Sequence, residues 1–383
     1  MNGKPEEGQR LAVATRVVHG DQFKDELTGA VAPPLAVSAT FDHSNPSGVA
    51  YGREHNPTWE LLERAIADLE DAAGCLSFAS GMAGIAAVLE LVPEGGKVVV
   101  ARDAYIGSRE LLRHLEERGR CEVERVDATD SEEVAAAAKG ARLVWVETLG
   151  NPLLTVPDLA RCAASAHAAG ALLVVDNTFA TPILCRPLNL GADIAVHSAS
   201  KYIGGHDDLM LGLVVVRSGD GLLEELRYHR TNAGGCPGQL EAWLALRGLR
   251  TLDVRLRRQV VSAAVIAKAV QAAPGVLRVH YPGLPDHPQH LLAAEQLDGG
   301  FGAMVSIELA ADAEQAERFC AATKVWTNAT SLGSVGSLLE RRGRWAGEEA
   351  LSPGLVRLSV GVEDPEDLVS DLAQALVTAG LGG

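Results

Sequence analysis

The chain has 383 residues, of which 47% are hydrophobic and 22% charged, and its formal net charge is −16. This length exceeds one ordinary hydrophobic core and indicates two domains, while the composition is that of a globular protein. An acidic surface repels phosphate backbones and anionic lipid. We therefore expect no nucleic acid and no membrane among the partners.

The six cysteines are scattered, and none lies at a spacing typical of a metal site; they are Cys75, Cys121, Cys162, Cys185, Cys236 and Cys320. We expect no metal, and buried thiols as in a reducing compartment. The N-terminal sequence is polar, and no apolar run reaches the ~20 residues of a membrane helix. These features predict a cytoplasmic protein.

Residues 1–50 are rich in Pro, Gly and Thr with little periodicity, which predicts an extended N-terminal arm. The segment Trp59–Asp71 then carries apolar residues at helical spacing, and a second helix is expected to begin near Gly81.

Residues 51–235 are predicted to form an α/β domain. Short apolar runs alternate there with helical stretches such as Asp158–Ala169. The runs are Lys97–Val100, Cys121–Val126, Leu143–Val146, Leu172–Val175, Ile194–Val196 and Leu213–Val216. Because they are continuous rather than alternating, they indicate a mostly parallel central sheet covered on both faces. Ligands of such sheets bind beyond the carboxyl ends of the strands.

Residues 236–383 differ in pattern and predict a smaller C-terminal α+β domain. A long helical stretch, Gln239–Ala273, comes first. A strand follows at Ala303–Leu309, and a last helix is expected at Pro365–Ala379.

A carboxylate and a lysine follow two of the predicted strands. Asp176 comes directly after Leu172–Val175, and Lys201 lies five residues beyond Ile194–Val196. Pyridoxal phosphate chemistry requires this pair, since the amine forms an imine and the carboxylate keeps a proton on the pyridine nitrogen. The alternatives are a turn cap for Asp176 and a solvated amine for Lys201.

Several groups near these strand ends could bind the cofactor phosphate. Ser198 and Ser200 offer hydroxyl donors. In Ser80-Gly81-Met82-Ala83 a small-residue turn precedes a helix, which suits an anion on the backbone N–H groups of Gly81 and Met82. An ordinary helix cap at Ser80 is the alternative.

Two aromatic or cationic positions are further candidates. Tyr105 follows a predicted strand and could stack on a planar cofactor, although most lone tyrosines belong to the core or the surface. Tyr51 and Arg53 could bind phosphate, or belong to the turn before the next helix.

One arginine, Arg357, lies within an apolar strand-like run. A buried guanidinium needs an anionic partner, because unpaired burial of a charge is costly. A substrate carboxylate is one candidate partner, and an internal Asp or Glu is the other.

Taken together and in this order, these motifs resemble the Cys/Met-metabolism pyridoxal-phosphate enzymes, the family of cystathionine γ-synthase, cystathionine γ-lyase and methionine γ-lyase. The similarity covers nearly the whole chain. It includes Thr15–His19, Gly29–Pro34, Tyr51–Thr58, Ser80–Ala83, Glu147–Pro152, Val175–Asn177, His197–His206, Leu246–Leu249, Tyr281–Leu284, His287–His290, Ser331–Gly333 and Arg357–Asp364. The resemblance implies the aspartate aminotransferase-like fold, known as fold type I.

The resemblance also implies roles for single residues. Lys201 would form the Schiff base and shuttle protons, and Asp176 would pair with the pyridine nitrogen. Tyr105 would stack on the ring and help to deprotonate the incoming amino acid. The remaining implied roles are phosphate binding by Gly81, Met82, Ser198 and Ser200, and binding of the substrate carboxylate by Asn151, Ser331 and Arg357.

In the family, the residues that match Tyr51 and Arg53 reach the phosphate of a neighbouring subunit. The resemblance therefore implies a homo-oligomer, a dimer at least and usually a tetramer.

The sequence departs from the family's pattern near the expected substrate site. Family members that handle cystathionine usually have Glu before Ser-Leu-Gly, and here Thr330 stands there. Gly336 stands at a position where an acidic residue is common in the family. Methionine γ-lyases typically have a Cys in the neighbourhood of Gly107, where this chain has none. The 338–353 segment is shortened, with Arg341–Trp345 in place of the family's usual sequence.

We therefore expect γ-elimination on a sulfur amino acid, methionine by preference, with release of 2-oxobutanoate, ammonia and a thiol. The alternatives are γ-replacement on an activated homoserine, as in cystathionine γ-synthase or an O-acylhomoserine sulfhydrylase, and cystathionine γ- or β-lyase activity. An aminotransferase and a non-enzymatic scaffold are the more distant possibilities.

Overall fold

The computed structural model describes residues 11–19, 29–45, 48–219 and 221–382. Its larger part is built on a seven-stranded sheet of order β1-β7-β6-β5-β4-β2-β3. The strands are β1 (Gly74–Phe78), β2 (Gly96–Ala101), β3 (Cys121–Val126), β4 (Ala141–Glu147), β5 (Leu172–Asp176), β6 (Ile194–Ser198) and β7 (Gly212–Val216). All six predicted strands are present, and β1 is an addition.

The sheet is mixed rather than wholly parallel. Strands β3, β2, β4, β5 and β6 run parallel to one another, but β7 is antiparallel to both β6 and β1. The run Leu213–Val216 was read as one of the parallel strands, and this direction is wrong. A continuous apolar run shows that both faces are buried, which holds for β7, but it does not show the direction of the strand.

The helices of the larger part cover both faces of this sheet. Successive residues of a strand point to opposite faces of the sheet. On β6, His197 forms a hydrogen bond with Glu70 of α2, whereas the next residue, Ser198, lies beside the start of α3. The two helices therefore lie on opposite faces. The helices are α1 (Val13–His19), α2 (Pro57–Glu70), α3 (Gly81–Leu89), α4 (Ile106–Glu117), α5 (Ser131–Ala137), α6 (Leu159–Ala168), α7 (Thr181–Leu184), η1 (Pro187–Leu190) and α8 (Leu222–Ala233).

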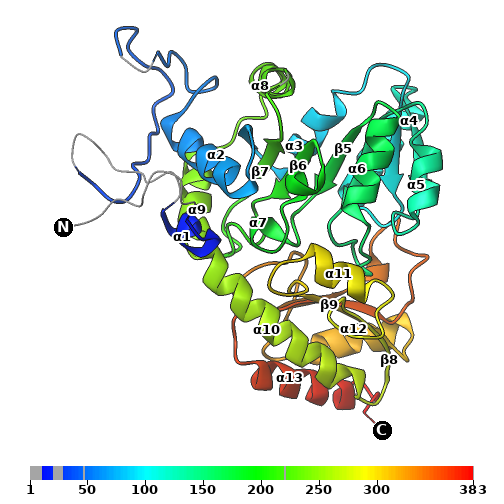
Figure 1. Cartoon of the computed structure of the whole chain (residues 1–383). Coiled ribbons are helices and arrows are strands. Elements are labelled where there is room, and N and C mark those ends of the chain that lie inside the picture. Colours follow the sequence, from blue (N-terminus) through cyan, green and yellow to red (C-terminus); the bar gives the residue numbers. More distant parts are fainter. Residues whose placement is uncertain (1–10, 20–28, 46–47, 220, 383) are drawn as a thin grey trace.

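A five-stranded sheet of order β10-β11-β12-β9-β8 forms the smaller part, drawn in yellow to red in the lower half of Figure 1. Its strands are β8 (Val276–His280), β9 (Met304–Leu309), β10 (Thr327–Asn328), β11 (Leu338–Arg341) and β12 (Leu355–Ser359). The helices are α9 (Gln239–Leu249), α10 (Leu252–Gln271), α11 (His290–Gln296), α12 (Ala313–Ala322), η2 (Arg342–Arg344) and α13 (Pro365–Thr378).

The stretch Gln239–Ala273, predicted as one helix, forms two helices, because the helical conformation is interrupted between α9 and α10 at Arg250 and Thr251. Two hydrophobic clusters meet along α10. Leu256 and Val260 belong to the larger cluster, and Ile266 to the smaller one. The expected boundary at residue 236 remains a prediction about separately folding units.

Residues 1–50 were predicted to be an extended arm, of which the described part contains the short helix α1. The segment before α2 extends away from the larger sheet at the left of Figure 1. The six cysteines are free thiols. Within the described ranges, no helix is long and apolar enough to cross a membrane, and no three His, Cys, Asp or Glu side chains gather as metal ligands would.

Candidate active site

The carboxyl ends of β5 and β6 bring Asp176 and Lys201 to the same edge of the sheet. Asp176 is the last residue of β5 and is aligned with Val196 of the neighbouring parallel strand. Beyond β6 the chain turns, with the Lys201 N–H donating to the Ser198 carbonyl at 3.1 Å. The predicted pairing of the two strand ends is therefore present.

The partly buried Lys201 amine contacts Ser331, a residue from the smaller part of the molecule. Lys201 Nζ donates a hydrogen bond of 2.7 Å to Ser331 Oγ. Burial, with help from the nearby Arg357 charge, lowers the pKa of Lys201 to about 8. With this pKa about a tenth of the amine is uncharged at pH 7, far more than for an ordinary lysine, and the uncharged form is the nucleophile that forms an imine.

Asp176 presents a partly buried carboxylate at the same edge. Its Oδ1 accepts the Thr178 N–H at 3.0 Å, which is the turn cap foreseen as the alternative reading. Burial nevertheless raises the pKa of Asp176, with its hydrogen bonds to Thr178 opposing the rise. A cationic group beside the carboxylate would restore its charge, so the cap leaves room for the expected pairing with the pyridine nitrogen, which stays a prediction.

The small-residue turn lies against the strand that leads to Lys201. Ser80 caps α3 by accepting the Ala83 N–H at 3.1 Å, so the ordinary cap is present. A Cβ on Gly81 would come within 3.3 Å of Ser198 Cβ, which places the free start of α3 beside the Ser198 hydroxyl. The first N–H groups of a helix have no acceptor within it and suit an anion.

Ser200 lies beside this turn but its hydroxyl already has a partner. Ser200 Oγ accepts the Leu211 N–H at 2.9 Å. Its role in phosphate binding therefore remains a prediction, as does that of the other phosphate-binding residues.

Tyr105 and Met82 lie close together at the mouth of the site. A Cβ on Gly107 would fall 2.5 Å from the Tyr105 ring and 2.8 Å from Met82 Sδ, so a side chain there would displace one of the two. Tyr105 remains 40% exposed, with its ring available to a ligand. Burial, followed by the charge of Asp176, raises the pKa of Tyr105, so the phenol keeps its proton at neutral pH.

Glu147 is a site residue that the sequence analysis missed as a functional candidate. It ends β4 next to Asp176, and its Oε1 accepts the backbone N–H of Tyr105. Burial and the Asp176 charge raise the pKa of Glu147 well above its usual range. A carboxylate closing a strand at the ligand-binding edge was the signal that could have found it.

Arg357 lies on β12 and reaches three partners. Its guanidinium donates to Asn151 Oδ1 at 3.0 Å, to the Ser331 carbonyl at 3.2 Å and to Glu340 Oε1 at 2.6 Å. Asn151, Ser331 and Arg357 are thus brought together as expected. Burial and the neighbouring Arg342 lower the pKa of Arg357 to about 10, which leaves it charged at neutral pH.

Glu340 is an internal carboxylate and therefore the alternative kind of partner expected for Arg357. It is paired directly opposite Arg357 in the antiparallel β11–β12 ladder and is 1% exposed. The sequence signal was an acidic residue directly after two leucines in an apolar run. Its presence does not exclude a substrate carboxylate, since a guanidinium has five donors.

Tyr51 and Arg53 belong to the segment before α2. The Arg53 guanidinium lies 5.5 Å from the centre of the Tyr51 ring and donates to the Thr231 carbonyl at 2.6 Å. Tyr51 is 45% exposed. Within this chain the pair contacts the end of α8, and its predicted reach to the phosphate of a neighbouring subunit remains a prediction.

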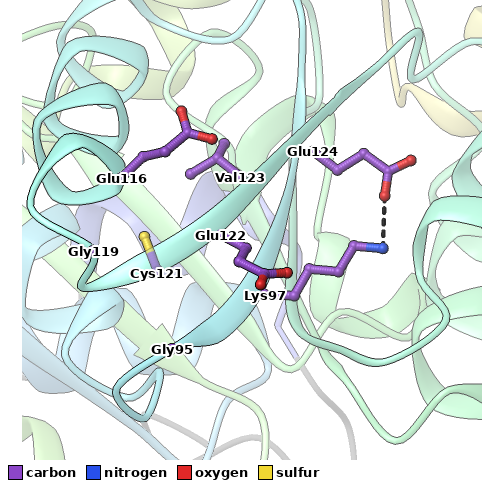
Figure 2. A pocket seen from close by; sticks show the side chains of 8 residues that line it. All are labelled: Gly95, Lys97, Glu116, Gly119, Cys121, Glu122, Val123 and Glu124. Atoms are coloured by element: carbon purple, nitrogen blue, oxygen red, sulfur yellow. Dashed lines mark ion pairs between the residues drawn. The ribbon is translucent and has the colours of Figure 1, made fainter.

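A cavity of about 540 Å³ lies elsewhere, on the outer edge strand β3 (Figure 2). It is lined by Gly95, Lys97, Glu116, Gly119, Cys121, Glu122, Val123 and Glu124. Gly95, Gly119 and Cys121 lie at the amino ends of β2 and β3, whereas Lys201 follows the carboxyl end of β6. The cavity is therefore not at the strand ends that carry Lys201. The charge of Lys97 is offset by Glu124, which lies 2.6 Å away. Glu116 and Glu122 then leave the lining acidic, which does not suit a phosphate.

Comparison with known proteins decides the family. The family model described as Cys/Met metabolism PLP-dependent enzyme matches residues 14–377. This chain belongs to that family. The resemblance seen in the sequence and the expected cofactor, pyridoxal phosphate, are therefore confirmed.

Relatives with different reactions are similarly close. A cystathionine beta-lyase of Coxiella burnetii is 39% identical, over 95% of this chain and 97% of that protein. A cystathionine gamma-synthase of Mycobacterium tuberculosis is 41% identical, over 95% of this chain and 96% of that protein. The structure of CalE6 from Micromonospora echinospora, named a methionine gamma lyase, matches with a TM-score of 0.91 and 43% identity. The match covers 96% of this chain and 99% of that chain. The fold prediction is confirmed.

The residues present fit the cofactor. The amine of Lys201 has a lowered pKa, the carboxylate of Asp176, whose pKa is raised, calls for a cation, and the glycine turn before α3 lies beside the Ser198 hydroxyl, where an anion suits the helix start. These are the three chemical features of pyridoxal phosphate: an aldehyde, a ring nitrogen that takes a proton, and a phosphate.

Proposed function

We propose that this pyridoxal-phosphate enzyme eliminates the γ-substituent of a sulfur amino acid, with methionine as the preferred substrate. The products are 2-oxobutanoate, ammonia and a thiol. The observation that carries this choice is Thr330, an exposed, uncharged residue directly before Ser331. A carboxylate at that position would help to bind the distal ammonium of cystathionine, and this chain has none there.

The surroundings of Arg357 favour a substrate whose γ-substituent is small and apolar. Trp345 Nε1 donates to Glu340 Oε2 at 3.1 Å, which ties the indole to the carboxylate that contacts Arg357. The indole is 39% exposed and offers an apolar surface to a methylthio group. CalE6, a neighbour in structure, is named a methionine gamma lyase in one structure and a cystathionine gamma lyase in another, so it supports γ-elimination on a sulfur amino acid without choosing between the two substrates.

In this proposal each residue has a defined task. Arg357, steadied by Asn151 and Ser331, binds the α-carboxylate and fixes the orientation of Cα. Lys201 Nζ takes the proton from Cα and moves protons at the neighbouring carbons, for which a pKa of about 8 is suitable. The cofactor, when bound, supplies the electron-withdrawing ring that makes the Cα proton acidic.

Tyr105 covers the open side of the site as a protonated phenol. Because its pKa is raised, it acts first as a ring that stacks on the cofactor and as a hydrogen-bond donor. The Glu147 carboxylate holds the backbone from which the ring projects. We also propose that Tyr51 and Arg53 act across a subunit interface, so that a homodimer is the smallest active unit.

A second candidate is γ-replacement on an activated homoserine. The observation in its favour is the 41% identity to a cystathionine gamma-synthase over almost the full length of both chains. The two reactions share the groups at Cα and differ in whether a thiol or water completes the turnover.

The test is a steady-state assay with L-methionine, L-cystathionine and an O-acylated homoserine, each with and without added thiol. We expect 2-oxobutanoate and ammonia from methionine without thiol. Turnover of the acyl-homoserine alone, and only with thiol present, would make the enzyme a replacement enzyme and overturn the proposal. Cystathionine as the best substrate would contradict the argument from Thr330.

A further inference from the structure

A second buried arginine, Arg342, lies behind the candidate substrate arginine. Arg342 is 3% exposed, and its Nη1 donates to the same Glu340 oxygen that Arg357 contacts. Glu340 therefore bridges two guanidinium groups in the interior. Arg342 belongs to the Arg341–Trp345 stretch, where this chain departs from the pattern of its family.

The opposite side of Arg342 is held by Glu348. Arg342 Nε and Nη2 donate to the two Glu348 oxygens at 2.9 and 2.8 Å, in the bidentate geometry that fixes both groups. Glu348 is 3% exposed and also lies 3.6 Å from Arg109 Nη2 of α4. Arg109 further donates to the Ala104 carbonyl at 2.9 Å, next to Tyr105.

The charges of this cluster are nearly balanced. The carboxylates of Glu340 and Glu348 offset the guanidinium groups of Arg342 and Arg357, and Arg109 adds one positive charge at the edge. A substrate carboxylate on Arg357 would then complete the balance. Charges interact strongly in a site of low dielectric constant, so the loss of any one of them changes what Arg357 can bind.

We propose that Arg342 is a positioning residue that sets the affinity of Arg357 for the substrate carboxylate. It shares the negative charge of Glu340, which would otherwise pair with Arg357 alone and compete with the substrate. Without Arg342 the cluster is already neutral, and an incoming carboxylate adds an uncompensated charge. This inference rests on the proposed role of Arg357 in substrate binding.

The test measures binding rather than turnover. The holoenzyme is titrated with glycine and, separately, with methylamine, which lacks the carboxylate, and the visible absorbance of the bound cofactor is followed. Arg342→Gln should weaken glycine binding about tenfold or more, as expected for truncating one partner of a buried charge pair, and leave methylamine binding unchanged. Arg342→Lys should recover part of the loss.

A matched control is Arg344→Gln in the same segment, since Arg344 is exposed and pairs with Glu317 away from Arg357. Its glycine affinity should equal that of the unaltered enzyme. The double variant Arg342→Gln with Glu340→Gln should regain glycine affinity, because the competing carboxylate is removed. A merely structural role for Arg342 would not produce this recovery.

Two outcomes would overturn the proposal. The first is an unchanged ratio of glycine affinity to methylamine affinity in Arg342→Gln, whether both affinities stay the same or fall equally. The second is no recovery of glycine affinity in the double variant. If Arg342→Gln does not fold, Glu340→Gln alone decides, since it should strengthen glycine binding and a weakening contradicts the proposal. Equal binding of the two amines by the unaltered enzyme would instead refute the role of Arg357 itself.

Discussion

The Lys201 amine donates a hydrogen bond to the hydroxyl of Ser331, across 130 positions of sequence. The carbonyl of Ser331 accepts from Arg357, so one residue of the smaller part contacts both the candidate nucleophile and the candidate substrate arginine. The backbone of Ser331 has a φ of 103°, a conformation that non-glycine residues rarely adopt.

Replacing Lys201 by alanine should abolish the visible absorbance of the protein-bound cofactor and lower turnover by about 10³-fold or more, because the nucleophile and the proton carrier are lost together. Absorbance spectra and a 2-oxobutanoate assay measure both effects. Lys268→Ala, at an exposed position of α10, is the control. A cofactor band that survives in Lys201→Ala would show that another group binds the cofactor.

Capture of the cofactor by the cofactor-free protein should depend on pH through Lys201. Its pKa is lowered from 10.5 to about 8, so the uncharged, reactive amine predominates above pH 8 and declines below it. The rate of Schiff base formation should rise with pH and level off above about 8. Stopped-flow absorbance measures this rate. A rise that continues to pH 10 would mean that the amine is not desolvated.

Asp176→Asn should keep the fold and lose activity. Asparagine preserves an oxygen to accept the Thr178 N–H, but it removes the charge that would hold a proton on the cofactor ring. We expect turnover to fall about 10²-fold or more, with the cofactor still bound. Activity and cofactor content are measured together, with Asp298→Asn as an exposed control. Full activity in Asp176→Asn would refute the assignment.

Arg53→Ala tests the proposed sharing of active sites between subunits. If Arg53 contacts the phosphate of a neighbouring chain, the variant should retain less cofactor on dialysis, by about tenfold in affinity, because a charge-assisted contact is lost. Arg118→Ala, at an exposed position after α4, is the control. A monomer of the unaltered protein with full cofactor content, shown by light scattering, would contradict the proposal.

The larger sheet could be predicted from sequence because its strands are short, continuous apolar runs between helices. The strand β1 was missed since its five residues, Gly74–Phe78, include a glycine and a buried serine and resemble a turn as much as a strand. The reversed direction of β7 depends on its pairing with β1 and β6, which no local pattern contains.

The chemistry at the strand ends was also predictable, because Asp176 directly follows one buried run and Lys201 lies five residues beyond another. The partners of Arg357 were not fully predictable. Asn151 and Ser331 are far from Arg357 in sequence and were assigned through the family resemblance, whereas Glu340 was left as an unnamed internal carboxylate. Cross-strand register decides that contact, and register is set by the whole sheet.

The helix α10 is part of both hydrophobic clusters, and Arg255 near its start donates to the carbonyls of Tyr202 and Ile203, directly after Lys201. Melting this helix would therefore expose two cores and release the turn that holds the lysine. Loss of either part removes the support of the other, so thermal unfolding should be a single cooperative transition in calorimetry rather than two.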